Sequence, residues 1–399
     1  MSFSPLSVVS QKAIHGAVQL KRSQVATTEE TRSLIPTLPG HFYVDPAVFL
    51  AEQSKIFAKL WFCTARASEL KTPGSFQTFE VGGESLIIVR DGDQQVRAFF
   101  NVCRHRGSRI CSEAVGQVKR TFQCPYHVWS YGLDGRLVGA PNMSMMPELE
   151  EAERSLLPVH VRVWLGYVWV CLAADAPDFE ESVVNQVTER FGDPETIERY
   201  GLDRLEVGRR IEYDVRGNWK LIVENFMECY HCANLHPELV AVIPEFRRGF
   251  PTQHKVGYGA EFGTDIRGFT FDGRQGFGSL EGLGAEQDRH YYGMTVLPQL
   301  VINLVPDHAI IHRIFPIAAD RTVVRCDWLF ASDVVNGGQD LGPSIELFHR
   351  VNTQDFAAVE GCQPSMGSRA FKDGGVFVPA EHHIAAFNQW VRDRLDEPA

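Results

Sequence analysis

The sequence lacks any long hydrophobic run, and no stretch approaches the ~20 consecutive apolar residues that a membrane-spanning helix needs. It also lacks an excess of positive charge, because 39 Lys and Arg stand against 50 Asp and Glu, for a formal net charge of −11. Chains that bind nucleic acid are usually basic. The composition therefore favours neither a membrane nor a nucleic-acid partner.

Cysteine is sparse, with an odd count of 9 in 399 residues. Secreted disulfide scaffolds are short and rich in cysteine, so we expect a reducing, cytoplasmic compartment with most cysteines as small buried residues. No hydrophobic segment of a signal peptide is present at the N-terminus. Residues 1–28 carry Lys12, Lys21 and Arg22 but no acid, which faintly resembles an organellar transit peptide and stays open as the alternative.

Internal repeats and nucleotide-binding fingerprints are also missing, since the glycine-rich stretch at 276–282 follows no clear strand. Short β-type runs separated by turn dipeptides predict a small all-β domain over residues 65–175. Residues 1–64 are expected to form an arm with one amphipathic helix, Asp45–Leu60, that packs on the C-terminal domain over residues 176–399. Residues 176–399 mix helical segments with antiparallel-type strands, so the fold class is α+β. The helices expected there are 180–191, 219–232, 345–362 and 380–395.

Two short motifs in the all-β region each combine a thiol with an imidazole. Cys103 and His105 form the first pair, Cys124 and His127 form the second, and 18 residues separate them. Each pair follows a predicted strand and precedes a turn, so two loop tips can meet around one cofactor. Two thiolates on one iron and two imidazoles on the other fit a [2Fe–2S] cluster of raised potential. Structural zinc is the rival interpretation, although zinc knuckles usually pair Cys with Cys and His with His.

A second constellation lies near residue 230. Glu224, Glu228 and His231 fall on one face of the helix predicted over 219–232, where an ordinary core helix would be apolar. His236 lies about 140° further round an ideal helix, so both histidines can share a metal only if the helix breaks. Pro237 disfavours α geometry at His236 and predicts that break.

Two imidazoles and one carboxylate make an open site for non-haem Fe(II). Asp355, which we expect at the start of another helix, is the candidate third ligand. Cys229 and Cys232 flank His231, and we expect both to pack into the helices rather than form a redox pair or zinc knuckle.

At this point the chain resembles the oxygenase (alpha) subunit of Rieske non-haem iron oxygenases, from about residue 40 to 392. The resemblance implies a [2Fe–2S] domain and a helix-grip-like catalytic domain built on an antiparallel sheet. It implies that Cys103, His105, Cys124 and His127 hold the cluster, and that His231, His236 and Asp355 hold the mononuclear iron. Glu228 matches the family's bridging acid, although many members have Asp there.

The resemblance also implies partners. The family works as head-to-tail trimers, so His127 of one chain would meet Glu228 of its neighbour. A separate NAD(P)H-dependent flavin or ferredoxin reductase would supply electrons, because no flavin or nicotinamide motif is visible in this chain. O₂ and a small molecule are the substrates.

The residues around Glu228 are similar to glycine betaine and related choline-type monooxygenases, which favours hydroxylation or oxidative N-demethylation of a quaternary ammonium compound. Ring hydroxylation of an aromatic acid is one alternative. A Rieske electron carrier, which would need only residues 65–175, and a zinc-stabilised binding module are others. A cation of this kind suits an aromatic cage, for which Phe226, Tyr291, Tyr292 and Phe315 are candidates.

Overall fold

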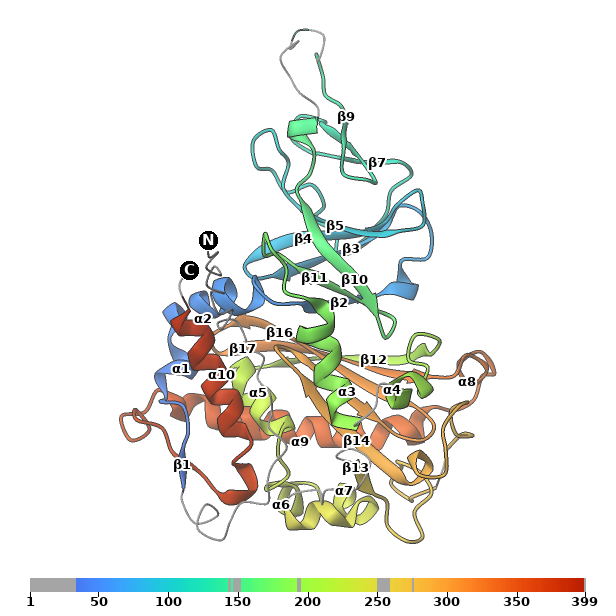
Figure 1. Ribbon diagram of the computed structural model, residues 1–399, viewed down its shortest axis with the longest axis vertical. Helices are drawn as coiled ribbons and strands as arrows, with labels where there is room; N and C mark the ends of the chain where they lie inside the picture. Colours follow the sequence, from blue (N-terminus) through green and yellow to red (C-terminus); the bar gives the residue numbers. More distant parts are fainter. Residues whose placement is uncertain are drawn as a thin grey trace, which may run out of the picture.

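Two antiparallel sheets carry the two halves of the chain in the computed structural model (Figure 1), which describes residues 34–142, 145, 152–191, 195–249, 259–274 and 276–397. The basic N-terminal segment and its possible targeting role lie outside these residues. Within them, no helix is both long and apolar enough to cross a bilayer.

The β domain contains a seven-stranded sheet in the order β2-β11-β10-β5-β4-β3-β6 and a three-stranded sheet in the order β7-β8-β9. Its longest apolar run, at β11, is buried at every position and forms a central strand beside β2. The expected domain start at residue 65 falls inside β2, so the sheet begins slightly earlier. The strands are β2 Phe62–Arg66, β3 Ser75–Val81, β4 Glu84–Arg90, β5 Val96–Phe100, β6 Val115–Gln117, β7 Thr121–Gln123, β8 Ser130–Gly132, β9 Leu137–Gly139, β10 Pro158–Trp164 and β11 Tyr167–Cys171.

The α+β domain is built on a six-stranded sheet in the order β12-β17-β16-β15-β14-β13. This sheet packs helices against both of its faces, because successive strand residues point in opposite directions. The strands are β12 Glu206–Val215, β13 Gly259–Glu261, β14 His290–Val296, β15 Leu300–Leu304, β16 Ala309–Ala318 and β17 Arg321–Phe330. The mixture of helices with an antiparallel sheet confirms the predicted α+β class.

Neighbouring residues of β16 show the two faces. Ile311 joins a core cluster with Phe191 and Ile197 of α3 (Asn185–Phe191) and α4 (Glu195–Arg199). Ile310 joins a different cluster with Phe348 of the long helix α9 (Gly342–Met366). Both metal-binding helical segments, described below, lie on this second face, which we call the α9 face. The remaining short helices and strands are α1 His41–Val44, α7 Pro237–Val242, α8 Ser332–Asn336, β1 Ile35–Pro36 and β18 Val376–Phe377.

The described part of the N-terminal arm, which starts at residue 34, packs on the α+β domain. The predicted helix over 45–60 is shorter in its α part, which is α2 (Pro46–Glu52), and continues as a π-helical turn over Gln53–Phe57. Glu52 is fully buried and accepts hydrogen bonds from Lys220 and Trp219 at the start of helix α5 (Trp219–Phe226). A buried ion pair therefore fixes the arm against α5. The C-terminal helix α10 (Ile384–Asp396) lies beside α1 and α2 in Figure 1.

Candidate metal centres

Two turns of the same form present the Cys and His pairs of the β domain. The Gly107 amide bonds to the Cys103 carbonyl after β5, and the Val128 amide bonds to the Cys124 carbonyl after β7. Both turns end in a left-handed residue, with φ +73° at Gly107 and +59° at Val128. That conformation is costly for a β-branched residue and persists where the surroundings enforce it, often at functional sites.

The four predicted cluster ligands lie together at the tips of these turns. The ring centroids of His105 and His127 are 4.7 Å apart, and the two thiols interact with each other. Trp129 stacks on His105 at 4.8 Å and orients it. Nδ1 of His127 is buried and has no hydrogen-bond partner among the described residues, which leaves a ligand atom to be satisfied. Two thiols, two imidazoles and an orphaned ring nitrogen fit a mixed-ligand iron–sulfur cluster.

Hydrogen bonds around the sulfurs favour one thiolate over the other. The Tyr131 hydroxyl lies 3.3 Å from Sγ of Cys103, and burial nevertheless raises the pKa of that thiol. Burial also opposes ionisation of Cys124, but hydrogen bonds from the backbone amide of Tyr126 and from neighbouring side chains lower its pKa. Cys111 is buried outside both turns, where its backbone amide bonds to Asn101, as expected for a packing residue.

The second site lies at the end of α5, and its local structure differs from the prediction. The helix expected over 219–232 stops at Phe226. Glu228 accepts a hydrogen bond from the Tyr230 amide, and such a side-chain bond competes with continued helix. Glu224 therefore does not share a face with Glu228 and His231, because it points instead to Tyr43 and to Asn388. Burial raises the pKa of Glu224 to about 7.

The break at His236 is confirmed. His236 has φ −125° and ψ 62° and lies between α6 (Cys232–Leu235) and α7, whose first residue is Pro237. The break brings the rings of His231 and His236 to a centroid distance of 5.1 Å. Asp355 reaches them from the middle of α9, rather than from the start of a helix as expected.

Two imidazole nitrogens converge on one carboxylate oxygen at this site. Nε2 of His236 and Nε2 of His231 lie 2.8 and 3.2 Å from Oδ1 of Asp355. On the far side of each ring, Nδ1 meets an acceptor oxygen, from Gln354 at His236 and from Glu228 at His231. Each Nδ1 can therefore carry a hydrogen, and both Nε2 atoms face the carboxylate.

This geometry calls for a positive charge between the three groups. Burial alone would lower the pKa of His231, but hydrogen bonds to Asp355 and Glu228 raise it to about 10. Hydrogen bonds from the two histidines hold the pKa of Asp355 below its usual range in spite of burial. A metal cation at the meeting point would satisfy all three ligands, so the donor set fits mononuclear Fe(II).

Two supporting residues escaped the sequence analysis. Gln354 orients His236 at 2.7 Å, and Asn225 donates to Asp355 at 3.2 Å. Gln354 directly precedes the predicted carboxylate ligand, and Asn225 lies three residues before Glu228. Adjacency to a ligand was the available signal, but an amide side chain is too common to single out without the fold.

Cys229 and Cys232 are joined in a disulfide around His231, which corrects the expectation of two separate packing cysteines. The packing itself holds, since both residues lie in the apolar cluster of the α9 face. The pairing arises because the turn after α5 places their Cα atoms 4.9 Å apart.

The four aromatic candidates for a substrate pocket separate in the structure. Phe226 lies 4.8 Å from the His312 ring, and Tyr291 is close enough to Asp355 for the carboxylate to help raise its pKa, after burial. Tyr292 points to the opposite face of β14, where it packs with Phe191. Phe315 stacks on Phe79 of the β domain. Tyr292 and Phe315 therefore lie outside the surroundings of the iron-ligand candidates.

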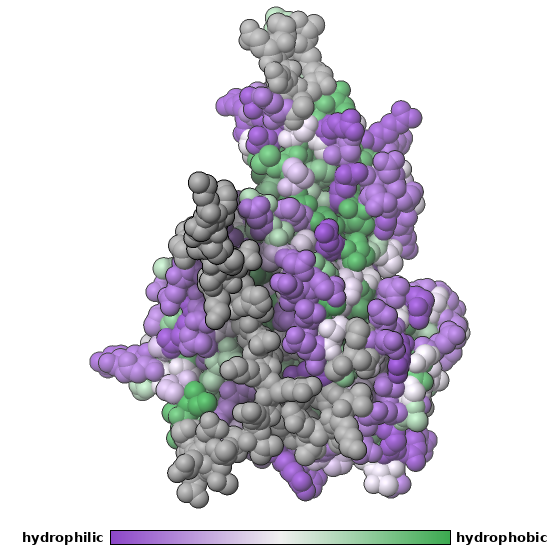
Figure 2. Space-filling model, viewed as in Figure 1, coloured by the Kyte–Doolittle hydropathy of each residue, from purple (hydrophilic) through white to green (hydrophobic). Residues whose placement is uncertain are grey.

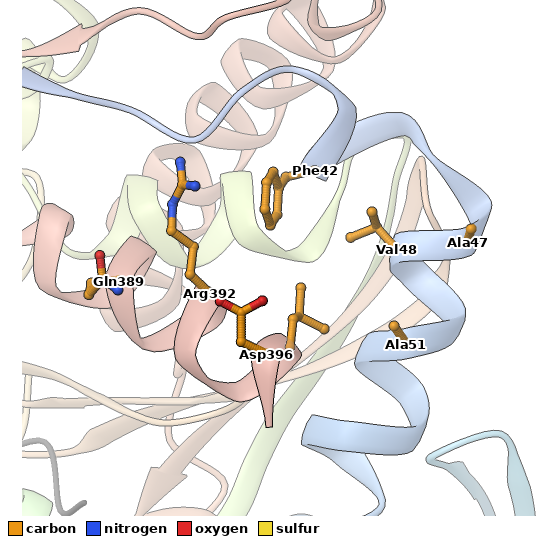
Figure 3. Close-up of a pocket in the computed structure, with 8 residues that line it drawn as sticks. Phe42, Ala47, Val48, Ala51, Gln389, Arg392 and Asp396 are labelled. Atoms are coloured by element: carbon orange, nitrogen blue, oxygen red, sulfur yellow. The ribbon is translucent and has the colours of Figure 1, made fainter. Parts of the chain in front are cut away.

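Two surface hollows lie elsewhere. One lies between α1, α2 and α10, with Phe42, Val48 and Arg392 in its wall (Figure 3). The other contains Trp61 and Phe179. None of the metal-ligand candidates lines either hollow, so neither belongs to the metal centres.

The β domain with its mixed-ligand turns and the α+β domain with its two-histidine, one-carboxylate centre define an oxygenase subunit that carries an iron–sulfur cluster and a non-haem iron. Comparison with protein families agrees. Residues 60–150 match the Rieske [2Fe-2S] domain, and residues 202–397 match the catalytic domain of the ring hydroxylating alpha subunit. The chain belongs to the Rieske non-haem iron oxygenases, as terminal oxygenase, and this removes the electron-carrier and zinc-module alternatives.

Relatives of known name cover nearly the whole chain. The glycine betaine monooxygenase oxygenase subunit of Pseudomonas aeruginosa strain UCBPP-PA14 is 30% identical over 98% of this chain and 96% of the relative. The carnitine monooxygenase oxygenase subunit of Escherichia coli strain K12 is 30% identical over 88% of this chain and 92% of the relative. The match confirms the predicted family.

Solved structures show the same architecture. The quaternary ammonium Rieske monooxygenase CntA, in complex with its substrate L-carnitine, superposes with a TM-score of 0.70 at 27% identity, covering 91% of this chain and 96% of CntA. Naphthalene 1,2-dioxygenase from Rhodococcus sp. gives 0.71 at 22% identity, covering 91% and 95%, and at that identity it supports the fold alone.

Proposed function

We propose that this terminal oxygenase hydroxylates an N-methyl group of a small quaternary ammonium compound, such as glycine betaine, and so removes the methyl group. The observation that carries the proposal is the convergence of His231, His236 and Asp355, with the aromatic side chain of Tyr291 close to Asp355. The names of the relatives, which include glycine betaine and carnitine monooxygenases, support the choice of substrate class.

The chemistry balances with two electrons and two protons. The N-methyl group, O₂, two electrons and two protons give the N-hydroxymethyl compound and water. That compound then loses formaldehyde and a proton to leave the demethylated amine. The mononuclear iron supplies O₂ activation when bound, and the cluster supplies one electron at a time from a reductase that we propose as a separate partner.

The chain's own residues prepare this site. Cys103, His105, Cys124 and His127 are the proposed cluster ligands, and the two turns hold them together. Gln354 and Glu228 keep the hydrogen of each ligand imidazole on Nδ1, so the opposite nitrogens are free for iron.

We also propose that electrons pass between subunits of a homotrimer. The three-stranded sheet next to the cluster turns and the helices α6 and α7 next to the iron site lie at opposite ends of the molecule in Figure 1. Glu228 bonds to His231 at one end, and it would face the partner subunit's His127. In Figure 2 the visible face of the β domain exposes hydrophobic residues between hydrophilic ones, and such patches are common at interfaces. Tyr126 and Val128, beside the cluster ligand His127, are each more than half exposed.

A single-turnover assay tests the substrate class. The iron-loaded protein is reduced chemically, freed of reductant and mixed with O₂ and a panel of betaines and aromatic acids. We expect demethylated product and an equal amount of formaldehyde from a betaine. Oxygen added to an aromatic ring instead would contradict the proposed substrate and move the enzyme to the aromatic alternative.

A further inference from the structure

A row of polar side chains crosses the α9 face of the six-stranded sheet, where apolar residues would be expected. Tyr291, Asn303, His312, Cys326 and Tyr213 come from β14, β15, β16, β17 and β12, which are five consecutive strands. Asn303, His312 and Cys326 are at most 1% exposed. Buried polar groups are costly unless they are hydrogen-bonded, so the bonds made by this row reveal what it does.

The donors and acceptors of the hydrogen bonds in the first half of the row can be assigned. The Asn303 side-chain nitrogen points to the Ile310 carbonyl, which accepts only, and the amide orientation follows from that contact. The same nitrogen lies 3.2 Å from Nδ1 of His312, which must therefore accept. The Asn303 side-chain oxygen then receives the hydrogen of the Tyr291 hydroxyl.

The second half continues in the same direction. Because Nδ1 of His312 accepts, its hydrogen is on Nε2, which donates to the Asn352 oxygen at 3.0 Å. The Asn352 nitrogen donates to the Tyr213 hydroxyl, whose oxygen lies 2.8 Å from Nδ1 of His349. Every hydrogen between Tyr291 and Tyr213 points away from Tyr291. Burial also lowers the pKa of His312 to about 4, so the ring is neutral at pH 7.

Tyr291 is the first residue of the polar row, and it is also the last residue of a series of contacting rings that begins near the iron ligands. We call this series the aromatic wall. The wall passes from Phe226 to His312 at 4.8 Å, to Phe348 at 5.5 Å, to Phe269 at 5.5 Å and to Tyr291 at 5.6 Å. Phe226 is in the last turn of the helix that leads to His231. The wall therefore joins Tyr291 to the metal site through continuous ring contacts.

We infer that Tyr291 determines substrate specificity, because its hydroxyl hydrogen is committed to Asn303 and only an oxygen lone pair remains for a ligand. The inference rests on the proposed function, and within that substrate class it favours quaternary ammonium compounds that carry a hydroxyl group over glycine betaine, whose polar group is a carboxylate. Tyr291 accepts a hydrogen bond from a hydroxyl group on the substrate and disfavours a carboxylate at the same place. Asn303 and His312 are positioning residues, which act by holding that hydrogen.

Ligand pairs that differ in one group test the inference. Choline and propyltrimethylammonium have nearly the same shape, because a methyl group replaces the hydroxyl group of choline. Binding to the iron-loaded protein without reductant, measured by calorimetry, should favour choline by about two- to tenfold, the value of one neutral hydrogen bond. Tyr291→Phe should bring the ratio close to one.

Two further variants separate this role from general damage. Tyr292→Phe alters the adjacent residue, whose hydroxyl is buried on the other face of β14 without a partner among the described residues, so the choline preference should remain. Asn303→Leu releases the Tyr291 hydrogen, so glycine betaine should gain affinity relative to propyltrimethylammonium. If Asn303 had only a structural role, its replacement would not change the affinity of the carboxylate ligand relative to the apolar cation.

The results separate a failure of the proposed function from a failure of the inference about Tyr291. If the wild-type enzyme with both metals binds no quaternary ammonium compound, the proposed function fails and the inference fails with it. If it binds them, the inference alone is overturned by a wild-type choline ratio near one, by a preserved ratio in Tyr291→Phe, or by an unchanged glycine betaine ratio in Asn303→Leu.

Discussion

Gln354 offers a sharp test of how the iron site is prepared. Its side-chain oxygen lies 2.7 Å from Nδ1 of His236, and the opposite nitrogen of the same ring faces Asp355. Gln354→Leu removes the acceptor and leaves the ring free to rotate or to place its hydrogen on Nε2. Supporting residues of this kind typically contribute 10- to 100-fold to metal affinity, so we expect a loss of about 1.4–2.7 kcal/mol.

The assay measures iron retained during dialysis against graded concentrations of a chelator. The visible absorption of the cluster serves as an internal control, because its proposed ligands all lie in the other domain. Gln354→Glu is the matched variant, since a carboxylate also accepts from Nδ1 and should preserve the affinity. Equal iron retention in Gln354→Leu and wild type would refute the reasoning, and so would an equal loss in both variants.

Three further changes follow from the same contacts. Glu228→Gln should keep both metals but slow re-oxidation of the reduced cluster in stopped-flow absorption, and a wild-type rate would remove the bridging role. Glu52→Gln leaves Lys220 buried without its charged partner, so the free energy of unfolding in denaturant titrations should fall by about 3–5 kcal/mol. Glu212→Gln is the control, because its Arg325 partner is at the surface and the change should be at most about 1 kcal/mol. Burial raises the pKa of Glu224 to about 7, so the folded chain holds a proton there that the unfolded chain releases. Stability therefore falls as the pH rises from the usual carboxyl pKa through 7. The melting temperature of Glu224→Gln should exceed that of wild type more at pH 8 than at pH 5, and a constant difference would contradict the assignment.

Local chemistry made part of the iron site predictable from the sequence. Pro237 restricts its neighbour, and the break at His236 follows from that restriction alone. The end of α5 was not predictable in this way. It depends on the hydrogen bond that the Tyr230 amide donates to the Glu228 carboxylate, which helix periodicity does not reveal. Had the helix continued over residues 227–232, as predicted, Glu224 would have shared a face with Glu228 and His231.

The aromatic wall depends on long-range packing, so the sequence could not show which aromatic residues belong to it. Tyr291 and Tyr292 are adjacent and chemically identical, and strand alternation requires them to lie on opposite faces. Only the position of α9 decides which face holds the iron ligands. Phe315 was plausible for the same reason, but the β domain packs against it.

The polar row suggests why the enzyme keeps buried amides beside its oxidising centre. Asn303 and Asn352 bear no charge, so the row orders the hydrogens of Tyr291 and His312 without adding a cation next to the proposed cationic substrate. A protonated histidine in the same place would repel that substrate, and burial keeps His312 neutral. The order of donors and acceptors thus determines that the Tyr291 hydroxyl group offers a ligand an oxygen lone pair and not a hydrogen. The specificity of the site would then depend on residues that never touch the substrate, which is why motif similarity around the metal alone cannot determine it.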